Sequence, residues 1–313
     1  MLRGPRRRPP ILPRGDLVRL QPRAEKILTQ ALRAPSHAYL FYGPEGTGKR
    51  DAALWFSQQL ICGCGDCPDC RRVVEGNHPD VRFWEPDGRS TKIEQVRQLI
   101  RATEMASFEG GRKVHVLDAQ SLTPEAANCL LKTLEEPREN TVLILLAESL
   151  DRILPTLVSR CQPVPFRLLS PQALEEALAD LGPNARTAAR LADGRIERAL
   201  ELLEAPPPAL SPLLNASLGE ALTEGERLAG LPEKEQIAEV ESMIAQVRDI
   251  MVWKETRNPL LLAFSQVQTF DKDARTTRDW LKTMDRLIET RRGLFSHANA
   301  KLSWAVLATE IHR

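Results

Sequence analysis

The sequence predicts an α/β core built on a parallel β-sheet, followed by a region that is wholly helical. Short apolar runs alternate with helical patterns up to about residue 166, as in a doubly wound parallel sheet. A glycine-rich turn follows the first apolar run and opens a helix. From residue 170 onward, the apolar residues recur only at helical spacing.

The glycine-rich turn at residues 43–50 reads Gly-Pro-Glu-Gly-Thr-Gly-Lys-Arg and comes directly after the apolar run 38–42. This context predicts a phosphate-binding loop (P-loop), in which backbone N–H groups surround phosphate oxygens at a helix N-terminus. The residues expected to contact ATP or ADP are Gly43, Gly46, Thr47, Gly48 and Lys49. Arg50 stands where the motif needs Ser or Thr for Mg²⁺, and a guanidinium offers no lone pair to a metal. The nucleotide site is therefore predicted to have a defective metal position.

Length, net charge and the longest apolar run limit the kinds of protein that this chain can be. A chain of 313 residues is expected to hold two or three domains, and its formal charge of +1 gives no overall attraction to nucleic acid or membrane. The longest apolar run, residues 142–147, is far too short to span a bilayer. A reducing, cytosolic compartment is the expected location. The arginines at positions 3, 6, 7 and 8 predict a disordered basic arm rather than a secretory signal or an anion site.

Four cysteines lie within nine residues, at Cys62, Cys64, Cys67 and Cys70. The glycines and proline between them permit the tight turns that tetrahedral S₄ coordination requires, so structural Zn²⁺ is the favoured interpretation. An iron–sulfur cluster or a disulfide is the alternative; the last three cysteines imitate a ferredoxin run, but the fourth cysteine followed by proline is missing. A closed four-ligand site leaves no position for a water nucleophile.

Residues 113–118 have the pattern of a buried parallel strand that ends in an acid. In a P-loop fold an aspartate there holds the Mg²⁺ shell, so Asp118 joins the predicted nucleotide site. His115, in the middle of the strand, is expected to be a core or edge histidine. Thr91 and Glu94 predict a capping box that opens the next helix upstream.

The helical region has a predicted boundary at residues 205–209, Ala-Pro-Pro-Pro-Ala, which reads as a stiff linker. Beyond it, apolar residues repeat at three- and four-residue steps, as in a helix packed along one seam: Ile237, Val240, Ile244, Val247 and Met251. This apolar stripe could pack either against other helices of the same chain or against partner subunits.

Residues 16–204 resemble the delta-prime type of clamp-loader subunit of bacterial DNA polymerase III, which belongs to the AAA+ family. The resemblance rests on the defective P-loop, the four-cysteine insertion, residues 128–137 (Asn-Cys-Leu-Leu-Lys-Thr-Leu-Glu-Glu-Pro) and Ser159-Arg160-Cys161. Residues 77–80, Asn-His-Pro-Asp, also fit. The C-terminal third matches only in being helical.

This resemblance implies three domains: an AAA+ core at 1–168 with a zinc module at 62–70, a helical lid at 169–206, and a helical collar at 207–313. It implies a hetero-pentamer with gamma/tau and delta subunits, which uses ATP to load a sliding clamp onto primer-template DNA. No membrane is involved.

The resemblance also implies a subunit that does not hydrolyse ATP. ATP-hydrolysing members have Ser or Thr at position 50, Glu at position 119 and a phosphate-contacting Arg at position 197, where this chain has Arg50, Ala119 and Glu197. Arg160 remains, and by resemblance it is an arginine finger that acts in trans on a neighbouring ATPase subunit. The alternatives are an ATP-hydrolysing motor subunit of the same complex and a zinc protein that binds nucleic acid directly. The second is weak, because only 5% of residues are aromatic.

Overall fold

The computed structural model describes residues 13–311 except 66, 89, 205–209, 216, 265–266, 268–269, 272 and 297–298. The predicted basic arm and the predicted linker at 205–209 therefore lie outside the described residues. The chain forms two compact units, one of Met1–Ala177 with Asp193–Arg198, the other of Leu178–Ala192 with Ala199–Arg313. The three-domain division stays a prediction.

The first unit is built on a parallel sheet with the strand order β2-β3-β4-β1-β5, which confirms the predicted fold class. Its strands are β1 (Ala38–Tyr42), β2 (Val81–Trp84), β3 (Lys113–Asp118), β4 (Thr141–Ala147) and β5 (Gln162–Pro165). β1 lies inside the sheet, between β4 and the edge strand β5.

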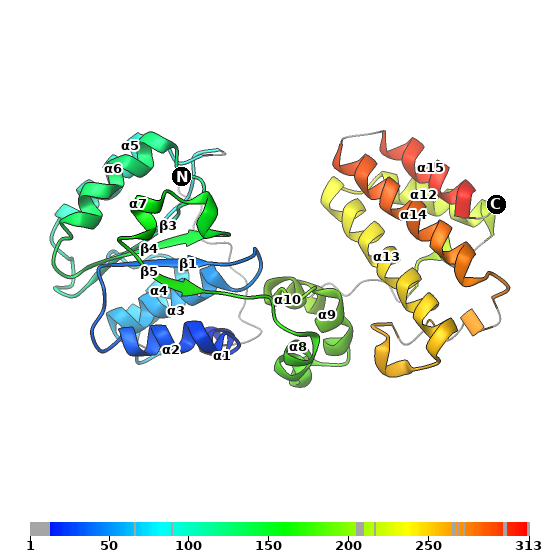
Figure 1. The fold of residues 1–313 in the computed structure, drawn as a ribbon, viewed down its shortest axis with the longest axis horizontal. Coiled ribbons are helices and arrows are strands. Elements are labelled where there is room, and N and C mark those ends of the chain that lie inside the picture. Colours follow the sequence, from blue (N-terminus) through cyan, green and yellow to red (C-terminus); the bar gives the residue numbers. More distant parts are fainter. Residues whose placement is uncertain are drawn as a thin grey trace. The chain divides into compact units, whose positions relative to one another are not determined.

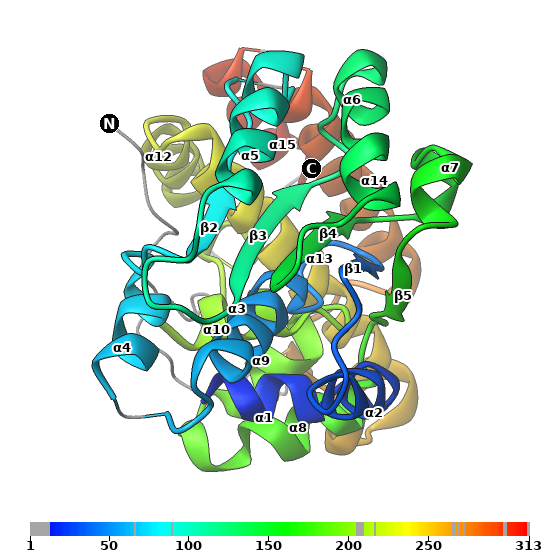
Figure 2. The same cartoon turned by 90° about the vertical axis from the view of Figure 1, so that its left-hand side faces the viewer.

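Helices cover both faces of this sheet (Figures 1 and 2). The helices of the first unit are α1 (Arg14–Arg19), α2 (Pro22–Ala31), α3 (Lys49–Ile61), α4 (Pro68–Glu75), α5 (Ile93–Glu104), α6 (Pro124–Glu135), α7 (Pro155–Val158) and α8 (Pro171–Leu178), with a short 3₁₀ turn η1 (Leu150–Arg152). Side chains alternate along β1: Tyr39 and Phe41 join the core under α2 and α3, whereas Ala38 and Leu40 join the core under α5 and α6. The result is a three-layer α/β/α core.

The start of α5 differs from the predicted capping box. The helix begins at Ile93 after Lys92, whose N–H donates to the Gln95 side chain at 3.3 Å. Thr91 is not the cap, because its hydroxyl is bonded to the Ser121 hydroxyl at 2.7 Å. The predicted capping box was wrong by one residue, since Lys92 and Gln95 take the positions expected for Thr91 and Glu94.

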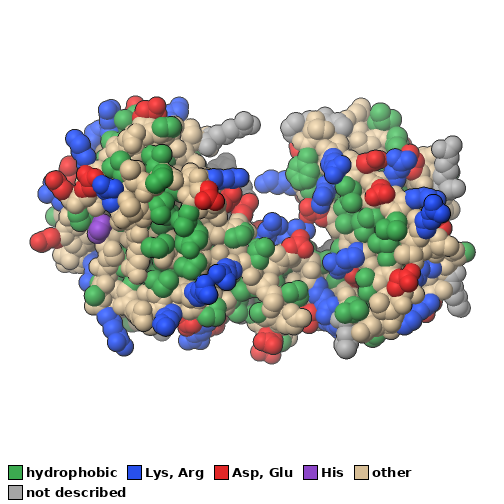
Figure 3. All heavy atoms as spheres, viewed as in Figure 1, with side chains coloured by type: hydrophobic (Ala, Val, Ile, Leu, Met, Phe, Trp, Pro, Cys, Tyr) green, Lys and Arg blue, Asp and Glu red, His purple; other side chains and the backbone are tan. Residues whose placement is uncertain are grey.

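The second unit is helical throughout its described residues. Its elements are η2 (Ala179–Leu181), α9 (Ala185–Leu191), α10 (Ile196–Glu204, whose first residues belong to the first unit), α11 (Pro212–Asn215), α12 (Leu218–Ala229), α13 (Glu233–Thr256), η3 (Pro259–Leu261), α14 (Thr277–Phe295) and α15 (Ala300–Ile311). None of the described helices has the length and apolar content needed to cross a bilayer. Acidic and basic side chains are interspersed on the face of each unit that Figure 3 shows.

The seam of α13 is shifted from the predicted one. Val240 and Val247 are buried as expected, but Met243 and Ile250 complete the buried stripe, while Ile237, Ile244 and Met251 are only partly buried. Asp249 is fully buried on the same helix, and its carboxylate accepts the N–H groups of Ala263 and Phe264 at 2.5 and 2.8 Å. The helix thus fixes a later loop of its own chain through a buried carboxyl group.

Candidate functional site

The P-loop follows β1 and leads directly into α3, as predicted. Gly43, Gly46 and Gly48 all have positive φ, and a Cβ on Gly43 would lie 2.1 Å from the carbonyl oxygen of Phe166. Lys49 Nζ donates to the carbonyls of Gly43 and Pro44 at 2.5 and 2.6 Å. Burial lowers the pKa of Lys49.

Thr47 is buried, and its side chain forms a hydrogen bond within the loop. Its hydroxyl donates to the carbonyl of Pro44 at 2.8 Å. Thr47 therefore shapes the loop internally.

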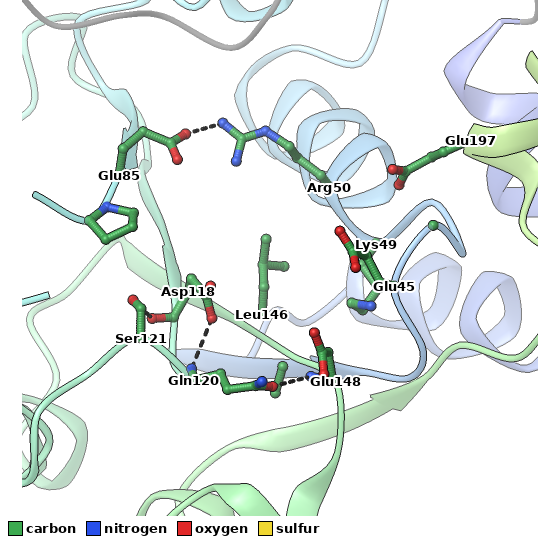
Figure 4. A pocket seen from close by; sticks show the side chains of 13 residues that line it. Glu45, Lys49, Arg50, Glu85, Asp118, Gln120, Ser121, Leu146, Glu148 and Glu197 are labelled. Atoms are coloured by element: carbon green, nitrogen blue, oxygen red, sulfur yellow. Dashed lines mark hydrogen bonds and ion pairs between the residues drawn. The ribbon is translucent and has the colours of Figure 1, made fainter. Parts of the chain in front are cut away.

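A cavity of about 450 Å³ opens beside the loop (Figure 4). Its lining is dominated by acidic groups, since five carboxylates face two cationic side chains. The carboxylates are those of Glu45, Glu85, Asp118, Glu148 and Glu197, and the cations are Lys49 and Arg50. Such a lining disfavours the polyphosphate that a P-loop usually holds.

Arg50, which stands at the sequence position of the Mg²⁺ ligand, is engaged with other side chains of the protein. Arg50 forms an ion pair with Glu85, and its guanidinium lies 4.9 Å from the ring centroid of Phe83. Asp118 ends β3 at the same edge of the sheet, where its carboxylate accepts the N–H of Gln120 at 2.9 Å. Burial, followed by the nearby Glu148 carboxylate, raises the pKa of Asp118. Ala119, which follows, is buried and offers no polar group to a water nucleophile.

The first residues of α10 lie directly on the P-loop and belong to the same compact unit. The N–H of Glu197 donates to the carbonyl of Gly46 at 3.1 Å, and the N–H of Gly48 donates to the Glu197 carboxylate at 3.2 Å. Arg198, one residue further, pairs instead with Asp193 at 3.7 Å.

Arg160 lies far from this cavity. β5 runs parallel to β1, with Tyr39 opposite Gln162, so Arg160 precedes the start of β5 whereas the P-loop follows the end of β1. An offset of about six residues along the strands corresponds to about 20 Å. Arg160 cannot reach the P-loop of its own chain.

The Arg160 side chain is about one-third exposed and is held by α6 and α7. It donates to the carboxylate of Glu135 at 2.5 Å and to the carbonyl of Thr156 at 3.0 Å. The side chain is therefore oriented before any partner is bound.

The four predicted metal ligands come together in the structure. Cys62 Sγ lies 3.4 Å from Cys64 Sγ and 3.6 Å from Cys67 Sγ, and the sulfurs of Cys64 and Cys70 are 3.8 Å apart. Zinc–sulfur bonds of about 2.3 Å in a tetrahedron place sulfurs about 3.8 Å apart, so these residues fit Zn²⁺. The N–H groups of Gly65 and Cys70 donate to ligand sulfurs at 3.4 Å, and such donors stabilise thiolates.

Three acidic side chains around these sites were not predicted from the sequence. Glu85 directly follows β2 and Glu148 directly follows β4. Because the carboxyl ends of parallel strands meet at one edge of a sheet, these positions in the sequence could have predicted that both glutamates lie at the site. Glu135 lies inside the segment 128–137 but has no local pattern that would pair it with Arg160, 25 residues later.

The first half of the chain matches a known protein family. The family model described as DNA polymerase III, delta subunit, matches residues 20–170. DNA polymerase III subunit delta′ of Bacillus subtilis is 38% identical over 198 residues, which is 60% of each protein. The delta′ subunit of Pseudomonas aeruginosa is 34% identical over 246 residues, or 74% of this chain and 66% of that protein. The match thus spans less than two thirds of the length of either relative.

Subunits with other names are also similar. The tau subunit of Bacillus subtilis DNA polymerase III is 34% identical over 188 residues, covering 54% of this chain and 33% of that protein. The crystal structure of a DNA polymerase III gamma subunit-related protein from Thermotoga maritima has the same fold, with a TM-score of 0.51 at 18% identity over 93% of this chain and 98% of that one. Because the relatives named delta′ agree with the family model and with the motifs described above, this chain belongs to the delta-prime family of DNA polymerase III clamp-loader subunits.

Proposed function

We propose that this chain works as the non-catalytic delta-prime subunit of a DNA polymerase III clamp loader. It assembles in the cytoplasm with gamma/tau and delta subunits in a hetero-pentamer, through which it meets the sliding clamp and primer-template DNA. Its own contribution to the reaction is Arg160, supplied as an arginine finger to the ATP site of a neighbouring subunit.

The placement of Arg160 is the observation that carries this proposal. The Arg160 side chain is partly exposed, is oriented by Glu135 and Thr156, and lies at the end of the strands opposite its own P-loop. A planar, permanently charged group in that position suits the charge that spreads over a phosphoryl group in the transition state.

The chain's own P-loop supports a non-catalytic role. Arg50 is committed to Glu85 at the position of the Mg²⁺ ligand, and Ala119 has no group to activate water. An ATP-hydrolysing motor would need both functions. We expect the purified protein, assayed alone, to hydrolyse no ATP. Turnover that disappears in a Lys49→Ala variant would contradict the non-catalytic role.

The first test is Arg160→Ala in a complex reconstituted with its gamma/tau and delta subunits. The variant should fold and assemble, because Arg160 is partly exposed and lies outside the hydrophobic core. ATP hydrolysis at the neighbouring site should fall by about 10³-fold or more, with slower clamp loading. Arg160→Lys should rescue only in part, since an ammonium lacks the planar fork.

A matched control is Arg19→Ala, which removes another surface arginine paired with one carboxylate, that of Asp16 at 2.8 Å. It should leave DNA-stimulated ATPase and clamp loading unchanged. Wild-type rates in the Arg160→Ala complex would refute the finger role.

A further inference from the structure

The P-loop of this chain is already in contact with an anion, the carboxylate of Glu197. The N–H of Gly48 donates to Glu197 Oε1 at 3.2 Å, and the backbone N–H of Glu197 returns a bond to the carbonyl of Gly46 at 3.1 Å. The side chain and the backbone of Glu197 thus both form hydrogen bonds with the turn that would surround a phosphate.

The neighbouring residues close the same contact. A Cβ on Gly46 would lie 3.0 Å from Cβ of Arg195, and one on Gly48 would lie 3.4 Å from Cγ2 of Ile196. The backbone of the P-loop is therefore in direct contact with the side chains of Arg195 and Ile196 at these two glycines. Both positions have a positive φ, which favours glycine, and at Gly46 a side chain would also press on Arg195.

The carboxylates that line the cavity also disfavour a bound phosphate. Glu197 is the largest of the nearby carboxylate influences on Lys49, followed by Glu148 and Glu45. Lys49 itself donates to the carbonyls of Gly43 and Pro44. The ammonium that would meet phosphate is thus surrounded by carboxylates of its own chain.

We propose that Glu197 is a built-in ligand of the P-loop, whose carboxylate takes the position of a phosphate oxygen at the Gly48 amide. A phosphate or nucleotide can bind the loop only after this carboxylate has left, because one amide hydrogen cannot serve two anions that also repel each other. The start of α10 is consequently held on the core without nucleotide. This goes beyond the role of Arg160, which lies at the other end of the strands and does not depend on it.

The test is calorimetric titration of the full chain with inorganic pyrophosphate in the absence of Mg²⁺. Affinity should rise in the order wild type, Glu197→Gln, Glu197→Ala, with a gain of at least tenfold for alanine. Glutamine removes the charge but keeps an oxygen that accepts a hydrogen bond, so its gain should be smaller. Hydrogen exchange of the peptide that contains Gly48 should be faster in Glu197→Ala and slow again when pyrophosphate is added.

Glu45→Gln is the matched control, since it removes one negative charge from the same cavity and leaves the bond between Gly48 and Glu197 in place. It should change pyrophosphate affinity less than Glu197→Gln. Equal affinity of wild type and both Glu197 variants, or an equal gain in Glu45→Gln, would overturn the proposal. Neither result would bear on Arg160, whose test is the ATPase of the reconstituted complex.

Discussion

Burial favours the neutral form of His115, which lies in the middle of β3. The pKa of His115 is lowered to about 4, chiefly by burial, and the positive charges of Lys113 and Arg82 act in the same direction. Its Nδ1 accepts the indole N–H of Trp84 at 3.3 Å, which requires the neutral ring at that atom. The prediction that His115 is a core histidine therefore agrees with its surroundings.

We expect His115 to make the protein less stable in mild acid. Its folded pKa lies below the unfolded value of about 6.5, so the unfolded chain binds the proton more readily as the pH falls from 6.5 toward 4. The loss from this group alone should be at most about 3 kcal/mol, and it is absent above the unfolded pKa. Urea unfolding at pH 7, 5.5 and 4 measures it.

The His115→Gln variant separates this effect from other acid-sensitive groups, because glutamine can still accept the indole N–H of Trp84. The free energy of unfolding should fall less steeply with pH in the variant than in the wild type. Parallel pH profiles for the two proteins would contradict the assignment.

At the scale of elements, the four-cysteine module depends on α4. Cys67 is the N-cap of this helix, and its sulfur accepts the N–H of Cys70 at 3.4 Å. A metal held by both residues would therefore fix the start of the helix. We predict one Zn²⁺ per chain at this closed site.

Cys64→Ser should lower the zinc content and loosen the module without altering the P-loop. Because ligand binding contributes directly to local folding, hydrogen exchange across residues 62–76 should accelerate, while exchange in β1 and β4 stays slow. Elemental analysis and exchange mass spectrometry give the two readouts. Iron, or no metal in protein prepared under reducing conditions, would contradict the zinc assignment.

Most strands of the core were predictable because both faces of a parallel sheet are covered, so each buried strand is continuously apolar. Residues 38–42 show this and form the inner strand β1, and residues 113–118, predicted as a buried strand that ends in an acid, form β3. β5 was not distinguished as a strand, because Pro163 and Pro165 remove two backbone donors. Such a sequence is tolerated only at an edge, and β5 is an edge strand.

The misses have local physical causes. The capping box failed because Ser121 competes for the Thr91 hydroxyl, a contact between residues 30 apart that no local pattern reveals. The seam of α13 was shifted because the helix buries polar residues, including Gln246 and Asp249, which an apolar pattern excludes. The cysteine cluster and P-loop were predictable because each is encoded by consecutive residues.

At the scale of the whole molecule, the two compact units have separate cores, so a change in one need not weaken the other. Asp249→Ala should destabilise the second unit by about 3 kcal/mol, since it leaves the buried N–H groups of Ala263 and Phe264 without their acceptor. Hydrogen exchange resolved by unit should show faster opening of α13 and α14 with little change in the sheet.

The control for this prediction is Asp285→Ala, which removes an exposed carboxylate from α14 and should alter stability by no more than about 0.5 kcal/mol. If Asp249→Ala accelerated exchange equally in both units, the independence of the two cores would be refuted.

The position of β1 inside the sheet has a consequence for synthesis on the ribosome. Its partners come late in the chain, since Ala38 pairs with Leu143 and Tyr39 pairs with Gln162. At about 5 to 20 residues per second, roughly 6 to 25 s pass between the emergence of Tyr39 and that of Gln162. Until β4 emerges, which takes up most of this time, an apolar strand has neither neighbour, and contacts so distant in sequence also form slowly. The nascent first unit is therefore most prone to aggregation before β5 leaves the exit tunnel.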